Sequence, residues 1–107
     1  FIDEENAKRK CFLTGKKILG TPSIDHVIPW SYMYSDDLWN LVYVLPEENS
    51  SKSNRLPNKK MIENLKTRNI NLLKITEKKG IHNKFTEELR LSIENNYVEK
   101  FWIGFKG

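Results

Sequence analysis

Two short segments in the first half of the chain have the pattern of β-strands. Residues 23–28, "SIDHVI", combine three β-branched aliphatic side chains with polar ones, and Pro29 ends the segment because it has no N–H to donate to a sheet. Residues 41–45, "LVYVL", are all apolar or aromatic and include two valines. We expect the two strands to pair in antiparallel fashion, with "WSYMYSDD" between them as a loop.

The residues on either side of this strand pair predict shorter elements. Residues 7–20 end in the turn signals "TGKK" and "LGTP", which predict either a short hairpin or an irregular lead-in. After the second strand, Pro46 suits the first turn of a helix, and the two acids that follow it favour a helix N-terminus. A short helix through about Ser53 is therefore expected.

The second half of the chain has helical periodicity. The side chains that recur near helical spacing after Pro57 are Met61, Ile62, Leu65, Asn69, Leu72 and Leu73. Gly80 is a stop signal for this helix. A last helix is predicted from about Thr86 to about Phe101, and the apolar tail "FWIGF" is expected to pack against the domain.

Length and composition restrict the class of protein. The chain has 107 residues, enough for one domain, with 38% hydrophobic and 30% charged residues. No apolar run is long enough for a membrane span, so we expect a cytoplasmic protein. The single cysteine, Cys11, excludes an internal disulfide. Because the sequence begins at Phe1 rather than Met, we expect a fragment of a longer protein.

The charges are distributed unevenly along the chain. The net charge is +4, but residues 21–49 carry five acids and no Lys or Arg, whereas residues 50–68 carry six basic residues against Glu63. An acidic block beside a basic block suits a metal ion held next to a polyanion. Taken alone, however, a charge run is more often a solvated face.

Four polar residues interrupt the predicted strand–strand–helix unit. Asp25 and His26 fall at the end of the first strand, Asn40 just before the second, and Asn49 in the first turn of the short helix. A helix packed across the strand pair would bring all four to one end of the unit. Neighbouring residues in a regular strand point to opposite faces, so Asp25 and His26 share a site only at a strand end or bulge.

These residue types have a common use in phosphodiester hydrolysis. Carboxylate and amide oxygens are hard ligands that suit Mg²⁺. An imidazole, whose unperturbed pKa is about 6.5, accepts a proton from water at neutral pH. An asparagine beside the imidazole fixes the orientation of the ring. Taken alone, Asn40 is also ordinary turn chemistry before a strand.

The spacing of these residues resembles the motif of HNH endonucleases. That motif has an Asp–His pair, a proline shortly after it, an "NL" pair, and an Asn or His nine positions after that asparagine, often followed by "xxK". The matching residues are Asp25-His26, Pro29, Asn40-Leu41, Asn49 and Lys52, and the resemblance covers roughly residues 11–57.

The resemblance implies a fold and a role for each matching residue. The fold is α+β, with a two-stranded antiparallel ββα-metal core (about 11–57) and additional flanking helices (about 58–107) in a single HNH nuclease domain. His26 is implied as the general base, Asn40 as the residue that orients it, and Asp25 and Asn49 as ligands of a divalent metal, Mg²⁺ or else Mn²⁺. The expected nucleic-acid contacts are Lys52, Arg55, Lys59 and Lys60.

One feature of many relatives is missing. Two Cys pairs that bind a structural zinc are reduced here to Cys11, with Thr14, Leu45 and Glu48 at the other positions. We therefore expect no structural zinc, and Leu45 to fill the space with apolar contacts. Cys11 is expected to be a small buried side chain rather than a nucleophile.

The sequence leaves several functional alternatives open. The aromatic residues of the loop, Trp30, Tyr32 and Tyr34, either stack on bases or cover a small core. The function predicted is cleavage of double-stranded DNA, in a restriction or phage-defence protein whose specificity domain or partner subunit lies outside this chain. The alternatives are an HNH-shaped module that binds nucleic acid without cutting it, and a protein-interaction domain.

Overall fold

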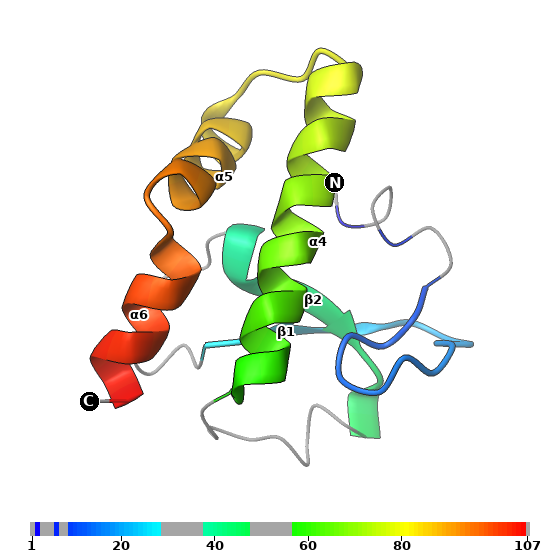
Figure 1. Ribbon diagram of the computed structural model, residues 1–107. Helices are drawn as coiled ribbons and strands as arrows, with labels where there is room; N and C mark the ends of the chain where they lie inside the picture. Colours follow the sequence, from blue (N-terminus) through cyan, green and yellow to red (C-terminus); the bar gives the residue numbers. More distant parts are fainter. Residues whose placement is uncertain (1, 3–5, 7–8, 29–37, 48–56, 107) are drawn as a thin grey trace.

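In the part of the chain that the structure describes, a two-stranded antiparallel sheet packs with three α-helices (Figure 1). The computed structural model describes residues 2, 6, 9–28, 38–47 and 57–106. The elements are β1 (Ser23–His26), the 3-10 helix η1 (Leu38–Asn40), β2 (Leu41–Val44), α4 (Lys59–Lys78), α5 (Lys84–Glu94) and α6 (Tyr97–Lys106). The predicted α+β class is confirmed.

The two strands are shorter than predicted but pair as expected. Their register sets Ser23 opposite Val44 and His26 opposite Leu41. In β2, Val42 and Val44 are buried whereas Leu41 and Tyr43 are partly exposed, so one face of the sheet covers the core. The first strand was predicted as far as residue 28. Val27 and Ile28 instead follow β1 outside the strand, where both are fully buried.

The lead-in before β1 is a small hairpin. Lys10 and Lys17 form an antiparallel bridge, and the Gly15 amide donates to the Cys11 carbonyl at 2.8 Å. Gly15 has φ of +76°, which a residue without a Cβ adopts most easily. The Phe12 amide donates to the Tyr43 carbonyl at 2.9 Å, so the hairpin attaches to β2.

The long helix α4 agrees with its prediction. Its N-cap is Asn58, whose side chain accepts a hydrogen bond from the Met61 amide. Gly80, two residues beyond the last helical residue, has φ of +68° and provides the predicted stop. The buried face of α4 consists of Ile62, Leu65, Arg68, Asn69, Leu72 and Thr76.

The single last helix that was predicted is wrong, because the segment forms two helices. Asn83 caps α5 and makes a reciprocal capping box with Thr86, the residue at which the predicted helix begins. The helix then ends at Glu94 with Asn95 as its C-cap, and Asn96 has φ of +53°. Asparagine tolerates this left-handed conformation, which breaks the helix and redirects the chain into α6. Among the described residues, no helix has the length and apolarity needed to cross a membrane.

The C-terminal helix packs back onto η1 and the start of α4. The Trp102 indole N–H donates to the Pro57 carbonyl at 2.9 Å. The rings of Trp39 and Phe101 lie 5.7 Å apart, and Tyr97 packs against both. The expected packing of the apolar tail is therefore confirmed for the buried Trp102, whereas Phe101 contacts Trp39 but is exposed, as is Ile103.

The connections on both sides of the sheet are described only in part. Pro46 and Glu47 are helical, but the rest of the short helix predicted as far as Ser53 lies outside the described residues. The loop that carries Trp30, Tyr32 and Tyr34 also lies outside the described residues.

A buried arginine ties α4 to η1 and β2. Arg68 is 6% exposed, and its guanidinium donates to the backbone carbonyls of Leu38, Trp39 and Leu41. The next residue, Asn69, accepts from the Arg68 Nε at 3.0 Å and donates to the Trp39 carbonyl at 2.9 Å. Three carbonyls that would lose water on folding thus find donors on α4.

We predict that Arg68→Met destabilises the protein strongly. The substitution keeps most of the apolar stem but removes the Arg68 donors of the Leu38 and Leu41 carbonyls, at a cost of about 2–4 kcal/mol. Urea unfolding measures this loss. The control is Arg90→Met, because Arg90 is bonded to Glu87 and Glu94 on the surface of α5, where ion pairs contribute little. Equal effects of the two substitutions would contradict the role given to Arg68.

Candidate active site

Asp25 and His26 are the last two residues of β1. They stand opposite Val42 and Leu41 of β2, and both are partly buried. The ladder ends at this pair, and the chain turns into the buried Val27. The sequence required a strand end or a bulge for these neighbours to share one site, and a strand end is what the structure has.

The Asp25 carboxylate is oriented by the backbone of its neighbour. Its Oδ1 accepts a hydrogen bond from the His26 amide at 2.9 Å. Asp25 has further interactions, and its Oδ2 atom is buried without accepting a hydrogen bond. A short side chain bonded to the next residue's amide has little rotational freedom. The carboxylate is therefore held close to the main chain of His26.

Asn40 fixes the chain immediately after His26. Its side chain is fully buried, its Oδ1 accepts from the Ile28 amide at 2.8 Å, and its Nδ2 donates to the Ile28 carbonyl at 2.8 Å. The Val27 amide also donates to the Asn40 carbonyl at 3.0 Å. The side-chain amide thus pairs with one residue in the way that a neighbouring strand would. These hydrogen bonds hold the backbone beyond His26, and the expected role of Asn40 in orienting the imidazole ring stays a prediction.

Residues that the sequence did not identify hold Asn40 in place. Arg68 and Asn69 of α4 bond the carbonyls of η1 and β2 on both sides of it. In the sequence, Arg68 stands out only as one charge of the basic run 50–68. Its spacing of three and four residues from the buried Leu65 and Leu72 is the signal for a position on the inner face of α4.

Cys11 and Leu45, which occupy two of the positions where many relatives have zinc-binding cysteines, lie next to each other beside β2. The Leu45 amide donates to Cys11 Sγ at 3.4 Å, and Cys11 is buried. Burial raises the pKa of the Cys11 thiol, but hydrogen bonds from Leu45, Thr14 and Leu13 outweigh it, so the pKa lies below its ordinary value. The expectation of a small buried side chain is confirmed. Glu48, the fourth position, lies outside the described residues.

Of the remaining predicted site residues, the structure describes only some. Asn49, Lys52 and Arg55 lie outside the described residues. Lys59 and Lys60 are both exposed in the first turn of α4. In the ranges that are described, no three His, Cys, Asp or Glu side chains gather into a metal-binding group.

The donor set nevertheless suits a hard cation. Asp25 supplies a carboxylate at the end of a strand, with one of its oxygens oriented by the His26 amide. Magnesium typically takes one or two such protein oxygens and keeps water or substrate phosphate at its other positions. A site of this kind needs no cluster of three acidic side chains.

Comparison with known proteins agrees with this arrangement. A search of curated proteins found no match to the chain. A family model described as HNH endonuclease matches residues 11–58, which include Asp25, His26 and Asn40. The family acts on nucleic acid as a nuclease, so the match supports a nuclease function. Residues 11–58, from the lead-in hairpin to the N-cap of α4, are thus similar to HNH endonucleases.

Proposed function

We propose that this chain is a metal-dependent endonuclease domain that hydrolyses phosphodiester bonds of double-stranded DNA. The observation that carries the proposal is the position of Asp25 and His26 at the end of β1, with Asn40 bonded to the backbone just beyond them. This geometry lies inside the segment that matches HNH endonucleases.

His26 acts as the general base. Its imidazole takes a proton from a water molecule, whose oxygen forms a bond to the scissile phosphorus. The bond from phosphorus to the 3′ oxygen breaks, and that oxygen gains a proton. The products carry a 5′-phosphate and a 3′-hydroxyl, as the resemblance implies.

Asp25 and Asn49 hold a single divalent ion, Mg²⁺ or Mn²⁺. When bound, the ion stabilises negative charge on the phosphate and the leaving oxygen. The role of Asp25 in this pair is to present a carboxylate whose direction the His26 amide already sets. The ligand and the base are then neighbours in the chain, so the position of one fixes that of the other.

Asn40 is a positioning residue in this scheme. It acts on His26 through the backbone of Val27 and Ile28, by the hydrogen bonds described above. A displacement of about 1 Å in a reacting group can cost two orders of magnitude in rate. A rigid backbone beyond the base is therefore part of the catalytic requirement.

The basic residues Lys52, Arg55, Lys59 and Lys60 are proposed to contact DNA phosphates. Target choice then comes from a specificity domain or partner subunit outside this chain, in a cytoplasmic restriction or phage-defence protein. The alternative function is an HNH-shaped module that binds DNA without cutting it.

We predict that His26→Ala abolishes cleavage of supercoiled plasmid in Mg²⁺ or Mn²⁺. Loss of the base lowers the rate by at least about two orders of magnitude, the typical contribution of general-base catalysis. Plasmid nicking is followed on agarose gels, and DNA affinity is measured in parallel. The matched control is His82→Ala, an exposed histidine between α4 and α5. A wild-type chain that binds DNA but never nicks it with any divalent metal supports the non-cleaving module.

Asn40→Asp is predicted to lower kcat while leaving DNA affinity near that of the wild type. The carboxylate keeps the size of the side chain but has no proton for the Ile28 carbonyl, which leaves a buried acceptor without its donor. Single-turnover cleavage gives the rate, and thermal unfolding gives the accompanying loss of stability. A variant that cleaves at the wild-type rate would contradict the positioning role.

Asp25→Asn is predicted to raise the Mg²⁺ concentration needed for half-maximal cleavage by roughly tenfold or more. The amide keeps one oxygen ligand but loses the negative charge that attracts the cation. Cleavage rates across a magnesium titration measure the shift. An unchanged midpoint would remove Asp25 from the proposed ligand set.

A further inference from the structure

We infer that the outer face of α4 extends the DNA-contact surface from Lys60, one of the contacts proposed above, along the length of the helix, where it binds the phosphate backbone of a duplex. The inference rests on the proposed function. We call this surface the outer stripe, and its residues are Lys60, Asn64, Thr67, Asn71, Lys74 and Lys78.

The geometry of α4 places these six side chains on one face. They follow one another at spacings of four and three residues, which is the repeat of a helix surface. All six are exposed, and the buried residues of α4 face the opposite way, toward the core. From Lys60 to Lys78 the stripe is roughly 27 Å long at the rise of an α-helix. A DNA helical turn is about 34 Å, so the stripe is long enough to follow a backbone.

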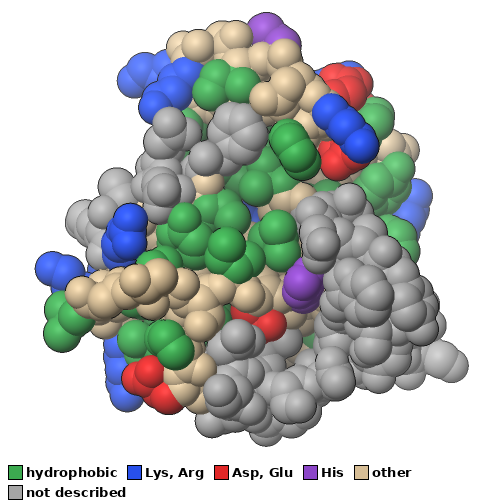
Figure 2. All heavy atoms as spheres, turned by 180° about the vertical axis from the view of Figure 1, so that it is seen from behind, with side chains coloured by type: hydrophobic (Ala, Val, Ile, Leu, Met, Phe, Trp, Pro, Cys, Tyr) green, Lys and Arg blue, Asp and Glu red, His purple; other side chains and the backbone are tan. Residues whose placement is uncertain are grey.

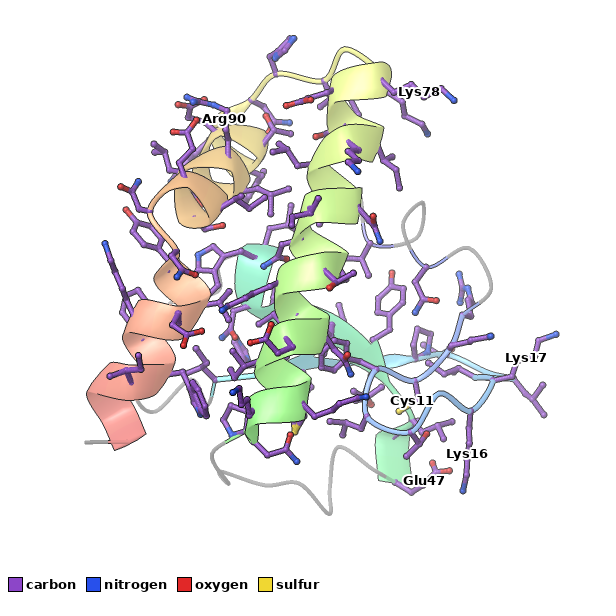
Figure 3. The ribbon with its side chains drawn as sticks, viewed as in Figure 1. Cys11, Lys16, Lys17, Glu47, Lys78 and Arg90 are labelled. Carbon is purple, nitrogen blue, oxygen red and sulfur yellow. The ribbon has the colours of Figure 1, made fainter. Side chains whose placement is uncertain are left out.

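Charge favours an anionic partner for this face. The six basic and two acidic residues of α4 give it a net charge of +4, which equals that of the whole chain. Lys66 is neutralised by Glu99 and Glu63, and Arg68 is buried. Within the described residues, the stripe lysines make no ion pair, and Figure 3 shows Lys78 extending outward at the end of α4. The two acids of α4, Glu63 and Glu77, lie beside the stripe, and its three lysines leave it net positive toward phosphate.

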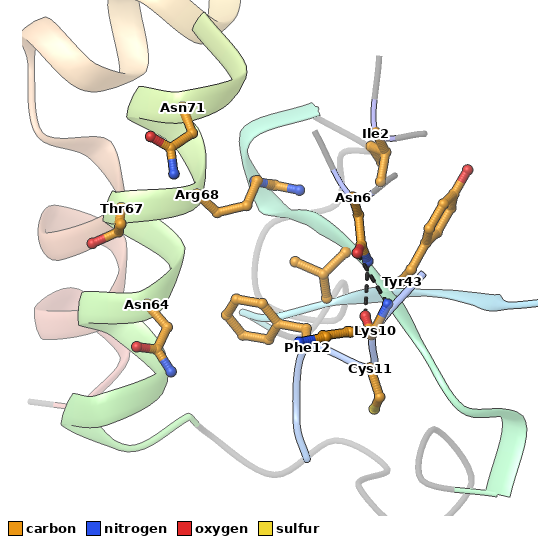
Figure 4. A pocket seen from close by; sticks show the side chains of 11 residues that line it. Ile2, Asn6, Lys10, Cys11, Phe12, Tyr43, Asn64, Thr67, Arg68 and Asn71 are labelled. Carbon is orange, nitrogen blue, oxygen red and sulfur yellow. Dashed lines mark hydrogen bonds between the residues drawn. The ribbon is translucent and has the colours of Figure 1, made fainter. Parts of the chain in front are cut away.

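The middle of the stripe is neutral and lines a pocket. Asn64, Thr67 and Asn71 form one wall of a cavity of about 330 Å³, and Lys10 and Tyr43 belong to the facing side. In Figure 4, Asn64 and Asn71 extend from α4 toward this space. Amide and hydroxyl groups are common donors to phosphate and sugar oxygens. A backbone that follows the stripe thus meets donors along its whole length.

The pocket adjoins the strand pair that carries the proposed active site. Tyr43 stands opposite Ile24 in the ladder, and Ile24 lies two residues before His26 in β1. Figure 2 shows the face seen from behind α4, where hydrophobic side chains gather at the centre and Lys and Arg side chains lie around the rim. Among the described residues, the centre of this rear face is therefore apolar rather than basic.

The test compares two pairs of lysine substitutions in the full chain. Lys74→Gln/Lys78→Gln removes two charges from the stripe, and Lys84→Gln/Lys100→Gln removes two exposed charges from α5 and α6. Affinity for a labelled duplex of about two helical turns is measured by fluorescence anisotropy over a salt titration, with EDTA present to prevent cleavage.

We expect the stripe pair to weaken binding about tenfold near 0.1 M salt, and to reduce the slope of log affinity against log salt by about 1.8, the value for two lost phosphate contacts. The α5–α6 pair is expected to leave the slope unchanged. The inference is overturned if the stripe pair has no effect, or if both pairs have the same effect, since net charge alone would then explain the result.

A second comparison tests the neutral part of the stripe. Asn64→Asp/Asn71→Asp places two negative charges beside the pocket without a change of shape, and is expected to weaken binding well beyond its control, Asn95→Asp/Asn96→Asp. Equal affinities of the two variants would count against the stripe. Because binding is measured without cleavage, a chain that binds through the stripe but never nicks DNA refutes only the proposed function. If the wild-type chain nicks DNA and the stripe variants bind DNA as tightly as the wild type, only this inference is refuted.

Discussion

The two hydrogen bonds between the Asn40 side chain and the backbone of Ile28 connect the fold to the proposed chemistry. They bind Ile28, two residues beyond the last ladder residue of β1, at the point where the chain leaves the sheet. An asparagine amide offers one donor and one acceptor, so it can satisfy both backbone groups of a single residue. The main chain after His26 is therefore held without a longer strand.

The helical half of the chain supports this arrangement rather than merely following it. Arg68 and Asn69 bind the carbonyls of η1 and of the first residue of β2, so the position of Asn40 is set from α4. In turn, α6 covers η1 through the contacts of Trp39 with Tyr97 and Phe101. The family match ends at residue 58, just before α4 begins. Residues outside the matching segment thus stabilise its central asparagine.

The sequence predicted the elements well and their ends less well. Strand pairing, α4 and its stop at Gly80 follow from local periodicity and turn chemistry, and these were correct. The break at Asn96 was missed because the apolar spacing continues across it, whereas a single left-handed residue decides the outcome. The role of Arg68 was missed for a different reason. Its partners are backbone carbonyls, which every residue has, and no sequence pattern identifies which of them will be buried and lack donors.

The choice of basic residue along α4 separates structural from binding roles. Its only arginine is the buried one, and its five lysines are exposed or partly exposed. A guanidinium has several donors in a fixed plane, so one side chain can serve three carbonyls at once, which an ammonium on a flexible stem does less well. Lysine keeps its hydration at a surface and makes contacts that are individually weak and sensitive to salt. The same helix can therefore bond the chain's own carbonyls on its inner face and a polyanion on its outer face. Because the two sets of contacts share no side chain, substitutions on the outer face should alter DNA affinity without disturbing the position of Asn40.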